Sequence, residues 1–105
     1  MESAELSSAV TRKARIRFLT PEEGGRQTAA WSGVHPHIKL GDIQSSCAVE
    51  SDSGPGPMPV GEYFDVKLRI LFPDWAGTRF AAATLVELFE GSRLVARGEF
   101  RDEQP

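Results

Sequence analysis

The sequence predicts an all-β protein, folded as a small antiparallel β-barrel or sandwich of about six strands. Three observations lead to this prediction. Several stretches alternate apolar and polar residues with a period of two, which is typical of strands that bury one face. Turn signals rich in glycine and proline separate these stretches at regular spacing. No long stretch repeats with a helical period, so we expect no long helix.

The chain has 105 residues, which is enough for one domain with a single core. We expect this domain over residues 14–101, after a flexible leader over residues 1–13 and before a tail over residues 102–105. The leader has no apolar run long enough for a signal peptide or a membrane span. The lone cysteine, Cys47, has no disulfide partner and is expected in the core, which favours a reducing cytoplasm.

The first strand is expected to begin at Ala14 and to end before Pro21, because apolar and basic residues alternate in ARIRFLT. A tight turn follows at Gly24 and Gly25, since adjacent glycines supply the positive φ angles that such a turn needs. Beyond the turn, a second extended stretch is expected over residues 28–40.

Gly33 and Pro36 interrupt this second stretch and predict a bulge or an edge strand. A third short strand is expected over residues 46–50, followed by an irregular loop over residues 51–61 that is rich in proline and glycine. The clearest strand comes next, in YFDVKLRILF. Its apolar face is expected to hold Phe64, Val66, Leu68, Ile70 and Phe72.

After this strand we expect a turn over residues 73–77 and a further strand over residues 79–89. Residues 81–83 tolerate a helix, whereas residues 84–86 favour a strand. A hairpin turn is expected at residues 90–92, and the last strand returns in RLVARGEF. The apolar face of that strand is expected to hold Leu94, Ala96 and Phe100.

The net charge of −3 argues against a protein built to grip a long stretch of phosphate backbone. The start of the fold nevertheless carries a basic run, which we interpret as a solvated strand face. This run comprises Arg12, Lys13, Arg15 and Arg17. No GxxxxGK[ST] motif is present, so GTP hydrolysis is excluded and no cofactor is expected.

The stretch EEGGRQTAAWSGVHPH holds residue types used in acid/base and zinc chemistry. Glu22 and Glu23 beside Arg26 suit either an acid/base pair with an anion clamp or a tight turn that the arginine ties down. We prefer the turn. His35 and His37 are spaced to share a strand face, but no third ligand is nearby, so no metal site is expected. A small enzyme built on these histidines and one glutamate stays an alternative.

Three motifs in this chain occur in the same order as in a known family. An EEGGR-x-T turn over residues 22–28 is followed by Gly33 and Pro36, residues 58–61 precede the clearest strand, and residues 89–93 form the hairpin. Together they resemble the C-terminal, third β-barrel domain of bacterial translation elongation factor Tu. The likeness covers roughly residues 14–100.

The resemblance implies a closed antiparallel barrel that stands alone in the bacterial cytoplasm, without the nucleotide-binding domain. Around the proline, positions that make contacts in the family hold Val34, His35 and His37 here, and the hairpin arginine of the family is Phe89. Loss of this arginine removes a phosphate partner. The resemblance therefore favours a protein partner over tRNA.

We accordingly expect a non-enzymatic module that binds a protein partner, with no GTP and no membrane among its partners. The residues expected to contact the partner are Arg26, Trp31, His35 and His37. Trp31 and Trp75 are either interface residues or plugs of the barrel. The alternative function is a tRNA- or RNA-binding accessory protein of translation that uses Glu90, Gly91 and Arg93 with the basic run. An exposed docking face would also suit a homodimer.

Overall fold

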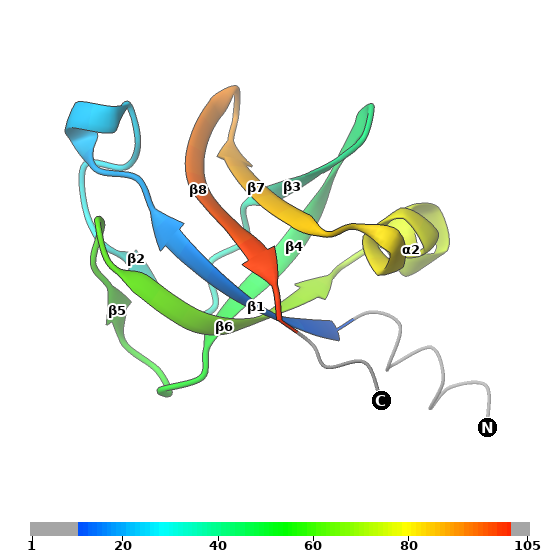
Figure 1. The fold of residues 1–105 in the computed structure, drawn as a ribbon, viewed down its shortest axis with the longest axis horizontal. Coiled ribbons are helices and arrows are strands. Elements are labelled where there is room, and N and C mark those ends of the chain that lie inside the picture. The colour runs from blue at the N-terminus through cyan, green and yellow to red at the C-terminus, as the bar shows by residue number, and fades with distance from the viewer. Residues whose placement is uncertain (1–10, 102–105) are drawn as a thin grey trace.

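The computed structural model describes residues 11–101, which form a barrel of strands with one short helix (Figure 1). The barrel strands are β1 (Thr11–Phe18), β3 (His37–Leu40), β4 (Ile43–Ser51), β6 (Tyr63–Ile70), β7 (Leu85–Glu90) and β8 (Arg93–Phe100). They close in the antiparallel order β1-β6-β4-β3-β7-β8, which confirms the predicted all-β barrel. A separate two-stranded sheet consists of β2 (Ala30–Trp31) and β5 (Pro57–Met58). The helices are the 3-10 turn η1 (Pro21–Glu23) and α2 (Pro73–Ala82).

The interior of the barrel is filled by the apolar residues that the alternating patterns predicted. On β1 and β6 six inward side chains are at most 2% exposed, and they are Ala14, Ile16, Phe18, Val66, Leu68 and Ile70. Phe64, also predicted to face inward, is half-buried and packs against this core. Among residues 11–101, Ser45 is the one buried polar residue, so no acid or histidine of this part of the chain lies in the core. The interior of the barrel is therefore an apolar core, and the charged side chains of residues 11–101 lie outside it.

The barrel closes where β1 meets β8, and Gly98 permits this close approach. Gly98 is paired with Ile16 across the two strands. A Cβ atom built on Gly98 would lie 2.7 Å from the Ile16 Cα atom, which is closer than real Cβ atoms come. Only glycine fits at this position without a shift of the backbone.

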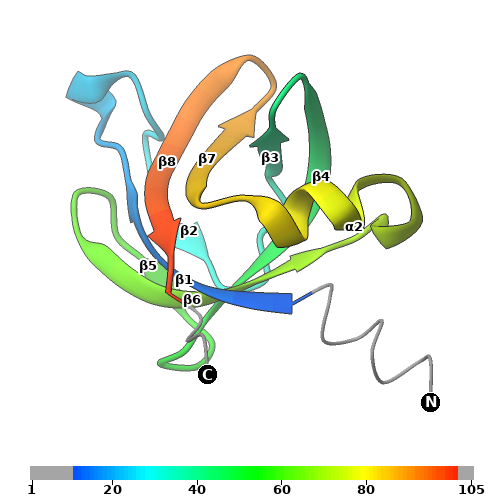
Figure 2. The ribbon, with the colours of Figure 1, turned by 45° about the vertical axis from the view of Figure 1, so that its right-hand side comes forward.

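The largest departure from the sequence prediction is α2, because a turn and the start of a strand were expected over residues 73–83. Pro73 occupies the first helical turn, where proline is tolerated, and alanines follow. Ala76 and Phe80, one helical turn apart, are buried in the barrel core. The helix therefore closes one end of the barrel (Figure 2). Phe72, which was predicted to face the core, precedes the helix and is 58% exposed.

Several strand boundaries also differ from those predicted. The barrel begins at Thr11 rather than Ala14, while residues 1–10 and 102–105 of the predicted leader and tail lie outside the described residues. The second stretch is divided into β2 and β3, as its interruptions indicated. The strand expected over residues 46–50 is longer and begins at Ile43, and β5 lies within the loop that was expected to be irregular.

The last strand departs from simple alternation. Ala96 is buried and Phe100 packs against the core, as predicted, but Leu94 is only half-buried while Val95 is fully buried. The register between β7 and β8 shifts between Leu88 and Phe89. Such a bulge changes which side chains face inward, and a pattern of period two does not anticipate it.

Candidate interaction surfaces

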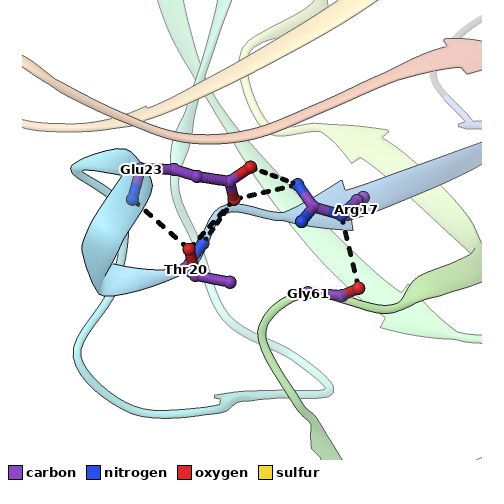
Figure 3. A network of polar contacts seen from close by, with 4 residues as sticks. All are labelled: Arg17, Thr20, Glu23 and Gly61. Atoms are coloured by element: carbon purple, nitrogen blue, oxygen red, sulfur yellow. Dashed lines mark hydrogen bonds and ion pairs between the residues drawn. The ribbon is translucent and has the colours of Figure 1, made fainter.

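The EEGGR segment is a turn fixed by a capping network, as Figure 3 shows. The Glu23 backbone N–H donates to the Thr20 hydroxyl, and the Thr20 backbone N–H donates to the Glu23 carboxylate at 2.8 Å. Arg17 pairs with the same carboxylate at 2.9 Å and also donates to the Gly61 carbonyl. The hydrogen bond from the Thr20 backbone and the one from Arg17 hold the pKa of Glu23 below its ordinary value. Glu23 therefore stabilises the turn, in agreement with the preferred interpretation of this segment.

The two glycines of this turn have different roles, which corrects the prediction that both supply positive φ angles. Gly24 has a φ of 85°, in the left-handed region. Gly25 has an ordinary φ, but a Cβ atom there would lie 2.6 Å from the carbonyl carbon of Leu19. The second glycine is needed for close approach of the backbone to residues before the turn.

The loop is fastened to the hairpin between β7 and β8 by two arginines. Arg26 donates to the Thr28 carbonyl at 3.1 Å, as predicted, and pairs with the Glu90 carboxylate. Arg93 donates to the Gly25 carbonyl at 3.2 Å. Sequence reasoning assigned Arg26 to a protein surface and Glu90, with Arg93, to an RNA surface. The structure joins all three in one internal clamp.

The remaining residues predicted for partner binding are exposed but dispersed. His35 and His37 face solvent, and His37 is paired with Phe89 next to the hairpin. Trp31 lies on β2, is paired with Pro57 and is 61% exposed. Within residues 11–101, no group of three His, Cys, Asp or Glu side chains is placed to hold a metal ion. Gly91 forms the hairpin turn with a φ of 64°.

Cys47 lies in the core, as predicted. Burial disfavours the thiolate and raises the pKa of this thiol to about 12. A thiol in this state is not a nucleophile at neutral pH.

An open groove lies where α2 meets the barrel, and sequence reasoning did not find it. It has a volume of about 470 Å³ and is open to solvent. We call it the α2 groove; its lining residues are Lys39, Leu40, Gly41, Arg79, Ala82, Ala83, Leu85 and Glu87. Arg79 donates to the Leu40 carbonyl at 3.3 Å and pairs with Asp42, which joins the helix to the turn after β3.

Large apolar side chains stand beside this groove. Leu85, in its wall, is 68% exposed, and Trp75 on α2 is 60% exposed. Trp75, Arg79 and Ala82 are spaced at i, i+4 and i+7, so they share one side of the helix. The exposure of Trp75 and Trp31 excludes the barrel-plug interpretation for both. Exposed aromatic side chains next to an apolar groove are typical of protein-binding surfaces.

A second surface lies on the outer face of β6 and β1. Lys67 and Lys13 stand directly opposite each other, and the Arg101 N–H donates to the Lys13 carbonyl. Arg69 lies opposite Thr11 in the next outward row. We call Lys13, Lys67, Arg69 and Arg101 the basic strip. None of these four side chains makes an ion pair with another residue of the described range 11–101.

The rest of the predicted basic run is occupied by contacts within the fold. Arg15 pairs with Asp65 at 3.4 Å and lies over the Tyr63 ring. Arg12 donates to the carbonyls of Phe80 and Ala83 at 2.7 Å. The expected solvated face is therefore present at Lys13 and Arg15, which are exposed, whereas Arg12 and Arg17 are half-buried by contacts within the fold.

No protein-family profile matches the chain, and no curated protein is significantly similar to it in sequence. Across residues 11–101, no helix has the length and apolar character needed to cross a membrane.

Proposed function

We propose that this protein is a non-enzymatic binding module that engages a protein partner through the α2 groove. The observation that carries the proposal is the position of Leu85 and Trp75. Both are large, apolar and more than half exposed. Leu85 lines an open groove, and Trp75 lies on the same side of α2 as Arg79 and Ala82, which also line it. Burial of such side chains in a partner would be favourable, because it removes apolar surface from water.

This proposal moves the docking surface away from the EEGGR segment. Arg26 and Glu90 neutralise each other, and Arg93 is held by a carbonyl of the loop. Side chains that already have partners gain less from a new contact, since the internal contact must first be broken. Leu85, in the α2 groove, has an apolar side chain, so a partner can contact it without first breaking an internal hydrogen bond or ion pair.

From the resemblance to the third domain of elongation factor Tu, we further propose that the protein is a stand-alone barrel of the bacterial cytoplasm with a role related to translation. The closed six-stranded barrel agrees with this origin in shape. In the EEGGR turn, on which the resemblance partly rests, Gly24 has a positive φ angle and Gly25 permits a close approach of the backbone. The resemblance implies a shorter segment between Pro73 and Glu90 than this chain has, and α2 lies in that segment, so we infer that the groove is a feature of this chain.

The test is affinity capture from the source cells with the tagged full chain, followed by quantitative mass spectrometry. Three baits are compared: the wild type, Leu85→Arg, and the double variant Arg26→Ala, Trp31→Ala. We expect a partner that the wild type and the double variant retain and that Leu85→Arg loses. Calorimetric titration of the purified partner then confirms direct binding. Identical protein lists for all three baits would contradict the proposal.

The basic strip favours a second candidate function, RNA binding. Like charges directly opposite on neighbouring strands destabilise a sheet, and Lys13 faces Lys67. Glu50, on the other side of Lys67, offsets only part of this repulsion. A polyanion would relieve it.

The RNA candidate is tested by filter binding of bulk tRNA at low and moderate salt. It predicts a steep loss of affinity as salt rises and weaker binding by Lys13→Glu at low salt. The Arg93→Ala variant is the matched control, because Arg93 already contacts the Gly25 carbonyl. No detectable tRNA binding at low salt would eliminate this candidate.

A further inference from the structure

We propose that the α2 groove accepts an extended peptide segment of the partner protein, which adds a strand at the seam between β3 and β7. This inference rests on the proposed function, because it specifies the form in which the partner enters the groove. It follows from the backbone of the two strands and from the side chains beside them.

β3 and β7 are paired over only part of their length. Cross-strand pairs join His37 to Phe89 and Ile38 to Leu88, and the pairing ends there. β3 continues to Leu40, and β7 has already begun at Leu85. The ends of both strands that lie toward α2 therefore have no strand partner across the seam. The same ends form two walls of the α2 groove, with α2 itself beside them (Figure 2).

The backbone of Leu85 faces this open seam. The Phe100 N–H donates to the Thr84 carbonyl, so Thr84 and Phe100 form a hydrogen-bonded pair. In an antiparallel ladder such pairs alternate with pairs whose N–H and C=O groups point away. Leu85, the next residue, therefore directs its backbone groups away from β8 and toward β3, beyond the last cross-strand pair that joins β7 to β3. Unpaired groups of this kind are a template for an added strand.

The side chains of the groove indicate which segment would fit. Leu85 and Ala82 offer an apolar surface to a side chain of the incoming strand. Lys39 and Glu87 give the groove one charge of each sign and, within residues 11–101, neither makes an ion pair, whereas Arg79 is held by Asp42. The occupant is thus an extended segment of a partner protein that places an apolar residue against Leu85, an acidic residue at Lys39 and a basic residue at Glu87.

The inference is tested with random peptides displayed on phage and selected on the full-length protein, with counter-selection on Leu85→Arg. Enriched peptides are synthesised and their affinities are measured by fluorescence anisotropy. The variants are Leu85→Arg and Ala82→Arg, both at exposed positions, and the matched control is Trp31→Ala on β2. Versions of each peptide with N-methyl groups at alternate residues remove backbone donors along one edge. Hydrogen exchange of the Leu85 amide is followed with and without peptide.

We expect enriched peptides to combine an apolar residue with charged residues of both signs and to bind Leu85→Arg and Ala82→Arg at least about tenfold more weakly than the control. N-methylation of one edge should cause a similar loss, and the Leu85 amide should exchange more slowly in the complex. Peptides that bind the groove regardless of N-methylation, with unchanged Leu85 exchange, would overturn strand addition but leave the proposed function standing.

Two further outcomes are decisive. If no peptide is enriched relative to Leu85→Arg, both the strand addition and the peptide-binding form of the proposed function fail. If analytical ultracentrifugation shows a dimer of the wild type that Leu85→Arg abolishes, the groove belongs to a second copy of this chain and the peptide proposal is overturned.

Discussion

Phe80 on α2 and Phe100 on β8 meet edge to face, with ring centroids 5.6 Å apart and ring planes inclined by 87°. The guanidinium carbon of Arg12 lies 3.7 Å from the centroid of the Phe100 ring. The same guanidinium donates to the backbone at the end of the helix. These contacts fix α2 against the barrel end, and they thereby set the position of the α2 groove.

Truncation of Phe80 should therefore destabilise the whole domain. We expect Phe80→Ala to lower the free energy of unfolding by about 3–5 kcal/mol, as for other buried phenylalanines. Phe72→Ala is the matched control, because Phe72 is more than half exposed and should lose less than about 1 kcal/mol. Urea unfolding followed by circular dichroism measures both. Equal losses would show that α2 does not close the barrel.

The close approach of β1 and β8 makes a second prediction. Gly98→Ala should lower the free energy of unfolding by about 1–3 kcal/mol or more, because its methyl group would overlap the β1 backbone. Gly77→Ala is the opposite control: Gly77 lies inside α2, its Cβ would have room, and alanine is the better helix former by about 1 kcal/mol. Thermal unfolding of both variants shows whether each substitution raises or lowers the stability of the domain. A neutral Gly98→Ala would contradict the account of barrel closure.

The capping network of Figure 3 predicts a pH dependence. The pKa of Glu23 is lowered in the fold, first by the Thr20 backbone N–H and then by Arg17. A carboxyl with a lowered pKa contributes stability that is full above its unfolded pKa of about 4.3 and is lost as pH falls through the folded pKa. The difference in Tm between wild type and Glu23→Gln should thus be constant near neutrality and shrink below about pH 4.3.

The control for this pH series is Glu22→Gln, at the neighbouring exposed position. The Glu22 side chain makes no hydrogen bond with any other residue of the range 11–101. Its Tm difference from wild type should stay small throughout. A Glu23→Gln difference that is unchanged by acidification would contradict the role given to the carboxylate.

The buried thiol gives a prediction about reactivity. Because burial raises the pKa of Cys47 to about 12, the folded protein should hold almost no thiolate at neutral pH. A chromogenic disulfide reagent should therefore react with Cys47 only after unfolding in guanidinium chloride. Rapid reaction of the native protein would show that the core opens or that Cys47 is accessible.

The strands that the sequence predicted best are those in which burial alternates without interruption. On β1 and β6 the pattern of period two matches the structure residue by residue. α2 was missed because its local signals are weak and its decisive contacts are distant. Phe80 is separated by about twenty positions from Phe100, and a ring contact at that separation leaves no trace in the local pattern.

The candidate site was harder to predict than the fold. The EEGGR segment suggested functional roles because it concentrates charge. Its Glu23 and Arg26 instead form ion pairs within the fold, with Arg17 and with Glu90 of the hairpin. The α2 groove gathers three short stretches around residues 40, 80 and 86, and none of them is unusual in composition. Only closure of the barrel places them together, so the groove is visible in the fold and not in the sequence.

The location of the docking surface is tested most directly by nuclear magnetic resonance. Backbone amide shifts of the full-length protein are recorded while the purified partner, or a peptide selected as above, is added. The account predicts that the largest changes fall on residues 39–41, 79–83 and 85–87, which line the α2 groove. Changes confined to residues 24–26 and 90–93, with the groove unaffected, would contradict it.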